Sequence, residues 1–243
     1  MKELTIATFN FRNTFAFYQT LKEKSDCFTF VKFIMENNID ILGTQETTIR
    51  KLRTCLPLLT EYGYKIYGDG RLGKIGLFFP FSLTNETNAI IFKDDMSERG
   101  ETLKLPWLGS QFPRIVTKGV FGNVVFLNTH LDYVNNKVKK KQLETIYYLI
   151  NDLVKMGKKI ILTGDFNMTL RSKDLKKFIN DLKILGIKRV PVNIMTCKGV
   201  KSGAIDHVFI PNKWEIKEVL LPELSISDHK PIVVKVRINE EDL

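Results

Sequence analysis

The chain alternates between short apolar runs and stretches in which apolar residues recur every three or four positions. The apolar runs are rich in β-branched residues and have the length of strands. We expect strands at Leu4–Phe9, Asp40–Gln45, Tyr64–Tyr67, Ile75–Phe79, Asn88–Phe92, Val124–Thr129, Lys159–Gly164, Ala204–Ile210 and Ile232–Ile238. The helical spacing predicts four amphipathic helices between them. Their apolar faces hold Val31, Ile34 and Met35; Ile49, Leu52, Leu56 and Leu59; Leu143, Ile146, Tyr147, Ile150 and Val154; and Leu175, Phe178, Ile179 and Leu182.

Strands outnumber helices, and the two kinds of element are mixed along the chain, which predicts an α/β layered fold. Ser172 is the expected N-cap of the last helix, with Asp174 in its first turn. A chain of 243 residues can bury one substantial core, and α/β folds of this size are commonly one domain. We therefore expect a single domain over residues 1–243. The sequence has neither repeats nor low-complexity linkers, and we expect a monomer.

The composition is that of a globular protein, with 44% hydrophobic and 26% charged residues. Met1-Lys2-Glu3 leads straight into the first strand without the features of a signal peptide, and no apolar run is long enough to span a membrane. These observations predict a cytoplasmic protein. Cys27, Cys55 and Cys197 lack the paired spacing of a zinc site and have no Cys-His signature around them, so we expect buried free thiols.

The net charge of +10 favours a polyanionic partner, since phosphates attract a basic surface. Only nine of the 37 basic residues are arginine, so a general bias toward lysine also explains the excess.

Polar residues cluster at the ends of the predicted strands. Asn10, Glu46 and His130 each follow a strand, and Asp165 and Asn167 follow another. Side chains at the ends of strands are held in place by the rigid sheet and lie next to the loops. Several strand ends can therefore surround one pocket. We expect one site assembled from the whole chain.

The three histidines lie in polar segments that suit catalysis. These segments are Asn128-Thr129-His130-Leu131-Asp132, Ile205-Asp206-His207 and Ser227-Asp228-His229-Lys230-Pro231. An imidazole that titrates near neutrality and is oriented by a carboxylate suits general acid/base work or binding of a charged transition state. Pro231 stiffens the segment of His229, and Asp206 is placed to accept a hydrogen bond from such a ring. For His207, a substrate contact and plain packing are both open.

Glu46 and Asp165 are carboxylates far apart in sequence. Mg²⁺ prefers one or two carboxylates together with waters and phosphate oxygens. Taken singly, Glu46 also fits a solvated loop residue, and Gly164-Asp165-Phe166-Asn167 also fits a turn.

Taken together, these segments resemble the endonuclease/exonuclease/phosphatase superfamily, whose fold is that of DNase I. The resemblance runs through Thr8-Phe9-Asn10, Gln45-Glu46, Asn128-Thr129-His130-Leu131-Asp132, Gly164-Asp165-Phe166-Asn167, Ile205-Asp206 and Ser227-Asp228-His229, in that order. It implies a four-layer α/β/β/α sandwich, in which helices flank two mixed β-sheets, and hydrolysis of phosphoester bonds that depends on Mg²⁺ or Mn²⁺.

The resemblance also implies residue roles. The metal residues would be Glu46, as principal ligand, with Asn10 and Asp228. Asp165 would orient or deprotonate the attacking water, and Asn167 would position the phosphate. The two remaining catalytic pairs are His229 held by Asp206, and His130, for which Glu86 is the candidate orienting carboxylate.

The chain departs from the branch that cuts DNA at abasic sites. Members of that branch typically carry an acidic residue shortly after the first-motif Asn and a Tyr where this chain has His130; here Asn10 is followed by Phe11-Arg12. The resemblance therefore favours the histidine-bearing branches, which include DNase I, deadenylases, neutral sphingomyelinases and many bacterial-type hydrolases.

Three further residues are substrate-binding candidates. Arg12 and Arg114 suit phosphate clamps because a guanidinium binds phosphate oxygens bidentately, although surface salt bridges fit equally well. Trp107, in a long segment without periodicity, suits stacking on a base or sugar, or anchoring of its loop. The run Lys137–Lys141 suits either a nucleic-acid backbone or a solvated helix face.

The leading hypothesis is a nuclease acting on DNA or RNA. The alternative is the same chemistry on a small or lipid phosphoester, such as an inositol phosphate, a nucleotide or sphingomyelin. A binding module without catalysis is disfavoured, because every expected polar group is present.

Overall fold

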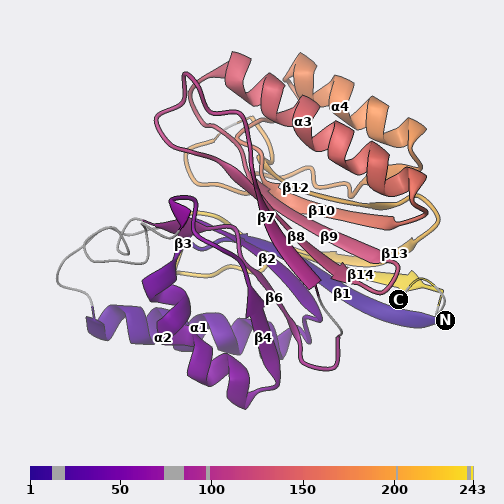
Figure 1. Cartoon of the computed structure of the whole chain (residues 1–243). Helices are drawn as coiled ribbons and strands as arrows, with labels where there is room; N and C mark the ends of the chain where they lie inside the picture. The colour runs from indigo at the N-terminus through magenta and orange to yellow at the C-terminus, as the bar shows by residue number, and fades with distance from the viewer. Residues whose placement is uncertain (13–19, 74–84, 97–98, 201, 240–241, 243) are drawn as a thin grey trace.

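Two mixed β-sheets face each other and carry helices on their outer faces (Figure 1). This computed structural model describes residues 1–12, 20–73, 85–96, 99–200, 202–239 and 242. The predicted strand Ile75–Phe79 lies outside the described residues. The expectation of a four-layer α/β/β/α sandwich is confirmed.

The first sheet has six strands in the order β13-β14-β1-β2-β6-β4. Its members are β13 (Glu215–Leu220), β14 (Ile232–Ile238), β1 (Lys2–Asn10), β2 (Ile41–Gln45), β6 (Ile90–Lys93) and β4 (Tyr64–Tyr67). Only the central pair β1–β2 is parallel, and the other neighbours are antiparallel.

The second sheet has six strands in the order β11-β12-β10-β9-β8-β7. Its members are β11 (Ile187–Arg189), β12 (Asp206–Pro211), β10 (Lys159–Asp165), β9 (Val124–His130), β8 (Ile115–Phe121) and β7 (Arg99–Lys104). Again one central pair, β9–β10, is parallel. A small two-stranded ladder joins β3 (Thr47–Thr48) to β5 (Glu86–Thr87).

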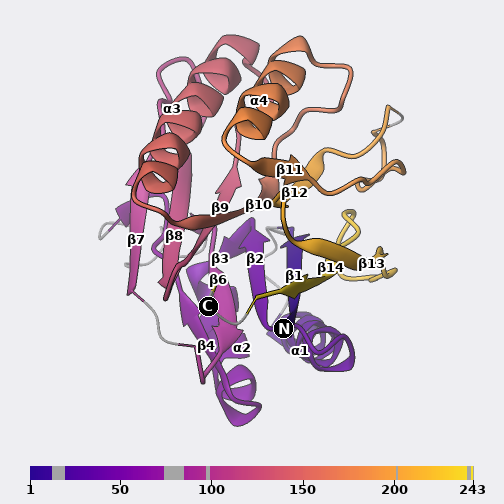
Figure 2. The ribbon, with the colours of Figure 1, turned by 90° about the vertical axis from the view of Figure 1, so that its right-hand side faces the viewer.

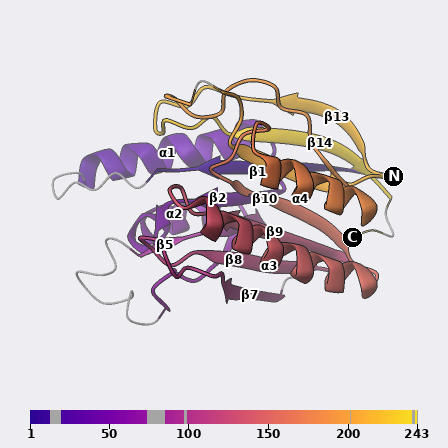
Figure 3. The same ribbon diagram turned by 90° about the horizontal axis from the view of Figure 1, so that it is seen from above.

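Two helices cover each sheet (Figure 2). The helices α1 (Thr20–Glu36) and α2 (Ile49–Glu61) lie outside the first sheet, and α3 (Asn136–Lys155) and α4 (Lys173–Ile184) outside the second. The predicted cap of α4 is confirmed, since the Ser172 hydroxyl accepts a hydrogen bond from the Leu175 amide. Figure 3 shows from above that the two termini lie at the same end of the sandwich.

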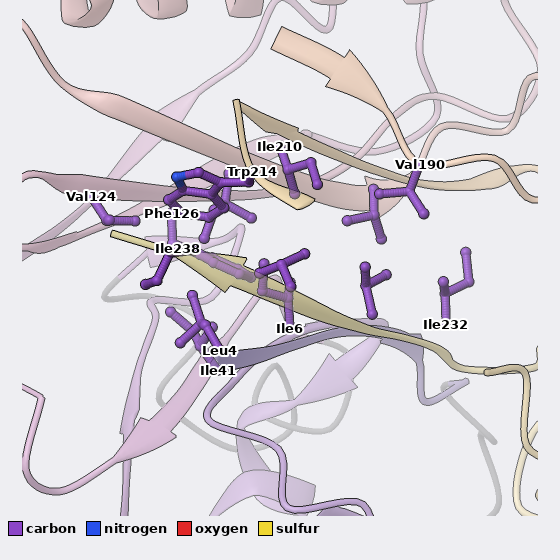
Figure 4. Packing of buried hydrophobic residues seen from close by; sticks show 14 of the residues in the cluster. Leu4, Ile6, Ile41, Val124, Phe126, Val190, Ile210, Trp214, Ile232 and Ile238 are labelled. Carbon is purple, nitrogen blue, oxygen red and sulfur yellow. The ribbon is translucent and has the colours of Figure 1, made fainter. Parts of the chain in front are cut away.

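The core between the sheets is built from alternate residues of the strands (Figure 4). Leu4 and Ile6 of β1 pack there against Phe126 of β9, and Trp214 closes the layer near the termini. The intervening residues Ala7 and Phe9 instead pack under α1. Because side chains alternate along a strand, the even-numbered residues of β1 face the opposite sheet up to its last residue, Asn10.

Several strands were missing from the expectation. β8 has Lys118 and Gly119 within its apolar pattern. β7 and β13 each lie at a sheet edge, and polar residues make up most of β7 and half of β13. The short strands β3, β5 and β11 offer too few residues for a period to show.

Two of the three cysteines are not free thiols. Cys27 of α1 and Cys55 of α2 form a disulfide with Cα atoms 5.3 Å apart, whereas Cys197 is a free, partly buried thiol. The prediction of three buried free thiols was wrong, because sequence spacing does not show that α1 and α2 pack side by side. Disulfides are typical of oxidising compartments, so this bond weighs against the predicted cytoplasmic location. None of the described helices is long and apolar enough to cross a membrane.

Candidate active site

The predicted polar residues meet between the two sheets, at the end of the sandwich away from the termini. The alternation that buries Phe126 and Ile161 in the shared core also directs His130 and Asp165 into the gap between the sheets. Strand register then sets Asp165 beside His130 on one side and beside Asp206 on the other. Three neighbouring strands therefore deliver three titratable side chains to one place.

Asp165 is the centre of this cluster. Asn10 Nδ2 donates hydrogen bonds to Asp165 Oδ2 and to Glu46 Oε1, each at 3.1 Å. The same Asp165 oxygen lies 3.7 Å from His130 Nε2 and 3.8 Å from His229 Nε2. Residues from both sheets thus converge on one buried carboxylate.

The environment of Asp165 raises its pKa toward neutrality. Burial, followed by the charge of Asp206, raises the pKa of Asp165 to about 7, although His229 and hydrogen bonds from Asn167 and Asn10 act in the opposite direction. A carboxylate with such a pKa can take a proton from water during a reaction and release it afterwards.

His229 carries a proton. Its Nδ1 donates to Asp206 Oδ2 at 2.9 Å. Burial disfavours the charged ring, but the hydrogen bonds of Asp206 and Cys197 and the charges of Asp206 and Asp165 raise the pKa of His229 to about 12. The predicted pairing of Asp206 with His229 is present, and it supplies an imidazolium beside Asp165.

His130 is held neutral. Burial, then the positive charges of Arg114, His229 and Arg71, lower its pKa well below the ordinary value. Asn167 Nδ2 lies 3.1 Å from His130 Nε2, so this nitrogen accepts and the ring proton resides on Nδ1. The two imidazoles on either side of Asp165 therefore differ in charge.

Strained loops present these groups. Glu46 and Asn167 follow their strands with φ of 53° and 49°, in the left-handed region that side chains other than Asn and Gly rarely adopt. The Asn167 amide donates to Asp165 Oδ1 at 2.8 Å, which explains an Asn at this turn. For Glu46 the conformation is costly, and such strain is found where a site requires it.

A buried polar network joins the two sheets directly beneath the cluster. Asn128 Oδ1 accepts from Gln45 Nε2 at 2.6 Å, and Asn128 Nδ2 donates to the carbonyl groups of Thr44 and Ala89. Gly43 leaves room for this amide, because a Cβ there would collide with Asn128 Oδ1. The network sets the spacing between the sheet that carries Glu46 and the sheet that carries His130.

The cluster suits a hard divalent cation. Glu46, His130 and Asp165 offer three ligand atoms within 4.8 Å of one another, as do Asp165, Asp206 and His229. Burial and the charge of Asp206 raise the pKa of Asp165 even with His229 beside it, so a further positive charge would stabilise the carboxylate form. Carboxylate oxygens with one partly exposed member, Glu46, fit Mg²⁺ or Mn²⁺.

Two of the predicted metal residues have other partners here. The Asn10 amide nitrogen faces the carboxylates, while its oxygen accepts from the Arg12 amide at 3.0 Å. Asp228 Oδ1 lies 3.7 Å from Arg12 Nε in a partly exposed ion pair. The roles of Asn10 and Asp228 as ligands and of Arg12 as a phosphate clamp stay predictions.

The other candidates lie on the β8–β9 side of the cluster. Glu86 binds Arg71 Nη1 through Oε2 at 2.6 Å, so its role as the carboxylate that orients His130 also stays a prediction. Arg114 is buried, with 6% of its surface exposed, whereas Trp107 is 47% exposed on the preceding loop.

His207 is a packing residue. It follows Asp206 on β12 and points to the opposite face of the sheet, where it meets Phe166 edge to face. Its Nε2 donates to the Met168 carbonyl at 2.8 Å, and its Nδ1 accepts from Arg189 at 3.0 Å. Of the two readings left open by the sequence, packing is the one observed.

Of two further residues in the site region, Arg71 was not singled out by the sequence and Lys139 was considered only as part of the run Lys137–Lys141. Arg71 lies beside His130 and carries no motif of its own. Lys139, within a run of lysines, is buried and donates from Nζ to the Asn167 carbonyl at 3.2 Å. Helical spacing was an available signal for Lys139, since it lies three and four positions before the buried Gln142 and Leu143.

The fold and the site define a phosphoesterase of the DNase I type. The chain belongs to the Endonuclease/Exonuclease/phosphatase family, which matches residues 18–229. The sequence resemblance noted above is thereby confirmed, and the chain is accordingly a phosphoester hydrolase of that family.

Solved structures show the same fold at low sequence identity. A mannosyl-6-phosphatase from Bacteroides thetaiotaomicron has a TM-score of 0.78 at 20% identity, over 97% of this chain and 100% of that one. ANGEL2, a 2′,3′-cyclic phosphatase, has a TM-score of 0.74 at 16% identity, over 99% and 96%. The human Nocturnin catalytic domain has a TM-score of 0.74 at 14% identity, over 97% and 93%. A search of curated proteins by sequence finds no match.

Proposed function

We propose that this chain is a Mg²⁺- or Mn²⁺-dependent phosphodiesterase that acts on nucleic acid. The observation that carries the chemistry is the placement of Asp165 between a neutral His130 and a cationic His229, with Glu46 joined to Asp165 through Asn10. Phosphodiester hydrolysis needs charge neutralised on the non-bridging oxygens, a water in line with the leaving group and stabilisation of the leaving oxygen.

The chain's own residues divide these tasks. Asp165 takes the proton of the attacking water, because its raised pKa matches a base at neutral pH. His229, kept charged by Asp206, donates to a phosphoryl oxygen as negative charge develops. Asn167 holds the His130 ring on the side of Asp165 opposite His229.

Glu46 is the first residue that would hold the ion, together with Asp228 and Asn10. A divalent ion bound there supplies positive charge to the phosphoryl oxygens and polarises a bound water. We further propose that residues 1–243 act as one catalytic domain and as a monomer.

The net charge of +10 and the surroundings of the site support nucleic acid as the substrate. Lys137, Lys140 and Lys141 are exposed at the start of α3, directly after the loop that follows His130. The half-exposed Trp107 is free to stack on a base.

The test is metal-dependent release of product from plasmid DNA, single-stranded DNA and RNA, with Asp165→Asn as the inactive variant and Lys213→Met as a surface control. We expect cleavage that stops in EDTA and falls at least about 1,000-fold in the variant, as is typical when a catalytic base is removed. Intact nucleic acid in the presence of either metal would exclude the nuclease.

A second substrate class, a small or lipid phosphoester, has one observation in its favour. Two arginines, Arg71 and Arg114, are buried beside His130, where they add positive charge within the site and not along its rim. Inositol phosphates, nucleotides and sphingomyelin belong in the same panel of substrates. Turnover of these compounds alone would assign the chain to this class.

A further inference from the structure

A small pocket lies next to His130, on the side away from Asp206. Its walls include Arg71, Glu86, Asn88, Arg114 and His130. Its volume of about 10 Å³ matches the space that one water or one oxygen atom needs. The pocket is therefore an extension of the site that accepts a single oxygen, with two guanidinium groups around it.

Arg114 is a buried cation that makes no direct ion pair within the described part of the chain. Among the described residues no carboxylate lies within ion-pair distance of it, and its Nε has no hydrogen-bond partner. A buried, unpaired charge is costly unless a ligand of opposite charge completes the site. The position is also well defined, because the Arg114 carbonyl accepts from the Leu105 amide at 2.9 Å and β8 begins at the next residue.

Arg71 is held against the same pocket from the other side. Its guanidinium is paired with Glu86 and stacks over the Phe112 ring at 4.5 Å from the centroid. Phe112 belongs to the same loop as Arg114, so one loop both supplies one arginine and supports the other. Two guanidinium groups with their parallel N–H donors suit the oxygens of a phosphoryl group.

We infer that Arg114 and Arg71 form a subsite for a non-bridging oxygen of a terminal phosphoryl group. The inference rests on the proposed metal-dependent phosphoester hydrolysis and extends its substrates from internal diesters to terminal monoesters. An internal diester has two non-bridging oxygens that share one negative charge, which His229 and a divalent ion held by Glu46 would neutralise. A terminal phosphate has a third such oxygen and a second charge; Arg114 neutralises this charge, while Arg71, paired with Glu86, donates hydrogen bonds to the oxygen.

The reaction at this subsite is hydrolysis of a monoester. Water adds to phosphorus, the bond from phosphorus to the ester oxygen breaks, and the leaving oxygen gains a proton, giving an alcohol and inorganic phosphate. The substrate is either a small phosphomonoester or the terminal phosphate of a nucleic acid, since both present the same group.

Two esters with the same chromophore distinguish a terminal phosphoryl group, which carries a second negative charge, from a diester, which carries one. We would measure kcat/KM for p-nitrophenyl phosphate and for bis-p-nitrophenyl phosphate in the wild-type protein, Arg114→Met and Arg114→Lys, with Lys213→Met as an exposed control. In Arg114→Met we expect the monoester value to fall about 10- to 100-fold, as for loss of a charge-assisted hydrogen bond, and the diester value to change less than about threefold. Arg114→Lys retains the positive charge but not the planar guanidinium, so its kcat/KM for the monoester should fall by an intermediate amount. This variant also keeps the test valid if Arg114→Met does not fold.

An equal loss for both esters, or no loss for either, would overturn the subsite. Binding of inorganic phosphate, measured by calorimetry without turnover, separates this failure from that of the proposed function. A wild-type protein that hydrolyses neither ester but binds phosphate through Arg114 keeps the subsite and refutes the hydrolase. A wild-type protein that cleaves the diester but binds no phosphate supports the hydrolase and refutes the subsite. A terminal phosphate on a DNA oligonucleotide, compared with glucose 6-phosphate, then shows which source of the group is preferred.

Discussion

At the scale of single residues, the three histidines occupy three different electrostatic environments. His229 has a carboxylate on Nδ1, His130 lies beside arginines, and His207 lies in an apolar layer between a backbone carbonyl and Arg189. One residue type therefore supplies a cation, a neutral ring and a packing group, because each partner sets which form is stable.

The charge of His229 depends on Asp206. In the metal-free protein at about pH 8 we expect nitrogen NMR spectra to show His229 protonated on both nitrogens and His130 and His207 neutral. Asp206→Asn removes the charge that raises the pKa of His229, so burial then dominates and the ring becomes neutral. The His207 signals serve as the internal control. A doubly protonated His229 in the variant would show that Asp206 does not set its charge.

His207 gives a stability that depends on pH. Burial, then the charge of Arg189, lowers its pKa to about 3 in the folded protein, against about 6.5 when unfolded. Below about pH 6.5 the imidazole of residue 207 binds a proton in the unfolded chain but not in the folded protein. The contribution of His207 to the free energy of unfolding is therefore complete above about pH 6.5 and is lost as the pH falls. Between pH 7 and pH 5 the loss amounts to about 2 kcal/mol in the free energy of unfolding.

Gln at position 207 cannot be protonated. Between pH 7 and pH 5 we therefore expect the free energy of unfolding of His207→Gln to fall by about 2 kcal/mol less than that of the wild-type protein. Urea unfolding at the two pH values measures this difference. An unchanged pH dependence in His207→Gln would show that another group is responsible.

At the scale of elements, the period of the strands explains which site residues were predictable. The alternation that places Val124 and Phe126 in the core also directs His130 into the gap between the sheets, and it sends His207 to the other face from Asp206. The cluster at the strand ends could therefore be predicted from local pattern.

Other parts of the site depend on long-range packing. Arg71 reaches the pocket beside His130 because it packs over Phe112, in the loop that ends at Arg114, and no local period shows this contact. The disulfide likewise depends on how α1 and α2 meet. Edge strands such as β13 were missed because one exposed face leaves too few apolar residues for the pattern.

The disulfide should stabilise the first helical layer. Cys27 and Cys55 are 28 residues apart, and closing a loop of that length lowers the entropy of the unfolded chain by an amount worth roughly 3–4 kcal/mol. We expect Cys55→Ser, or reduction of the wild-type protein, to lower the free energy of unfolding by about this amount, whereas Cys197→Ser should have little effect. Denaturant unfolding with and without dithiothreitol provides the measurement. Equal stability under both conditions would mean that the bond contributes nothing.

At the scale of the whole molecule, the site exists only where the two sheets are held at the right distance. Asn10 and Glu46 come from one sheet and His130 and Asp165 from the other, so a small shift of one sheet separates them. Asn128 is the residue that joins the sheets through hydrogen bonds in the layer below.

Asn128→Ala should therefore reduce both stability and activity. The change leaves Gln45 Nε2 with fewer acceptors and the buried Thr44 and Ala89 carbonyls without the amide, each loss being worth about 1–3 kcal/mol. Thr117 on β8 is the matched control, because it lies opposite Asn128 in the ladder and its buried hydroxyl has no hydrogen-bond partner among the residues that the structure describes. Thr117→Val should be neutral or stabilising. We expect kcat in Asn128→Ala to fall even at temperatures where circular dichroism shows the variant folded, since the two halves of the site no longer keep their spacing. A folded Asn128→Ala with the wild-type kcat would show that the spacing is set by the apolar core between the sheets and not by the amide network.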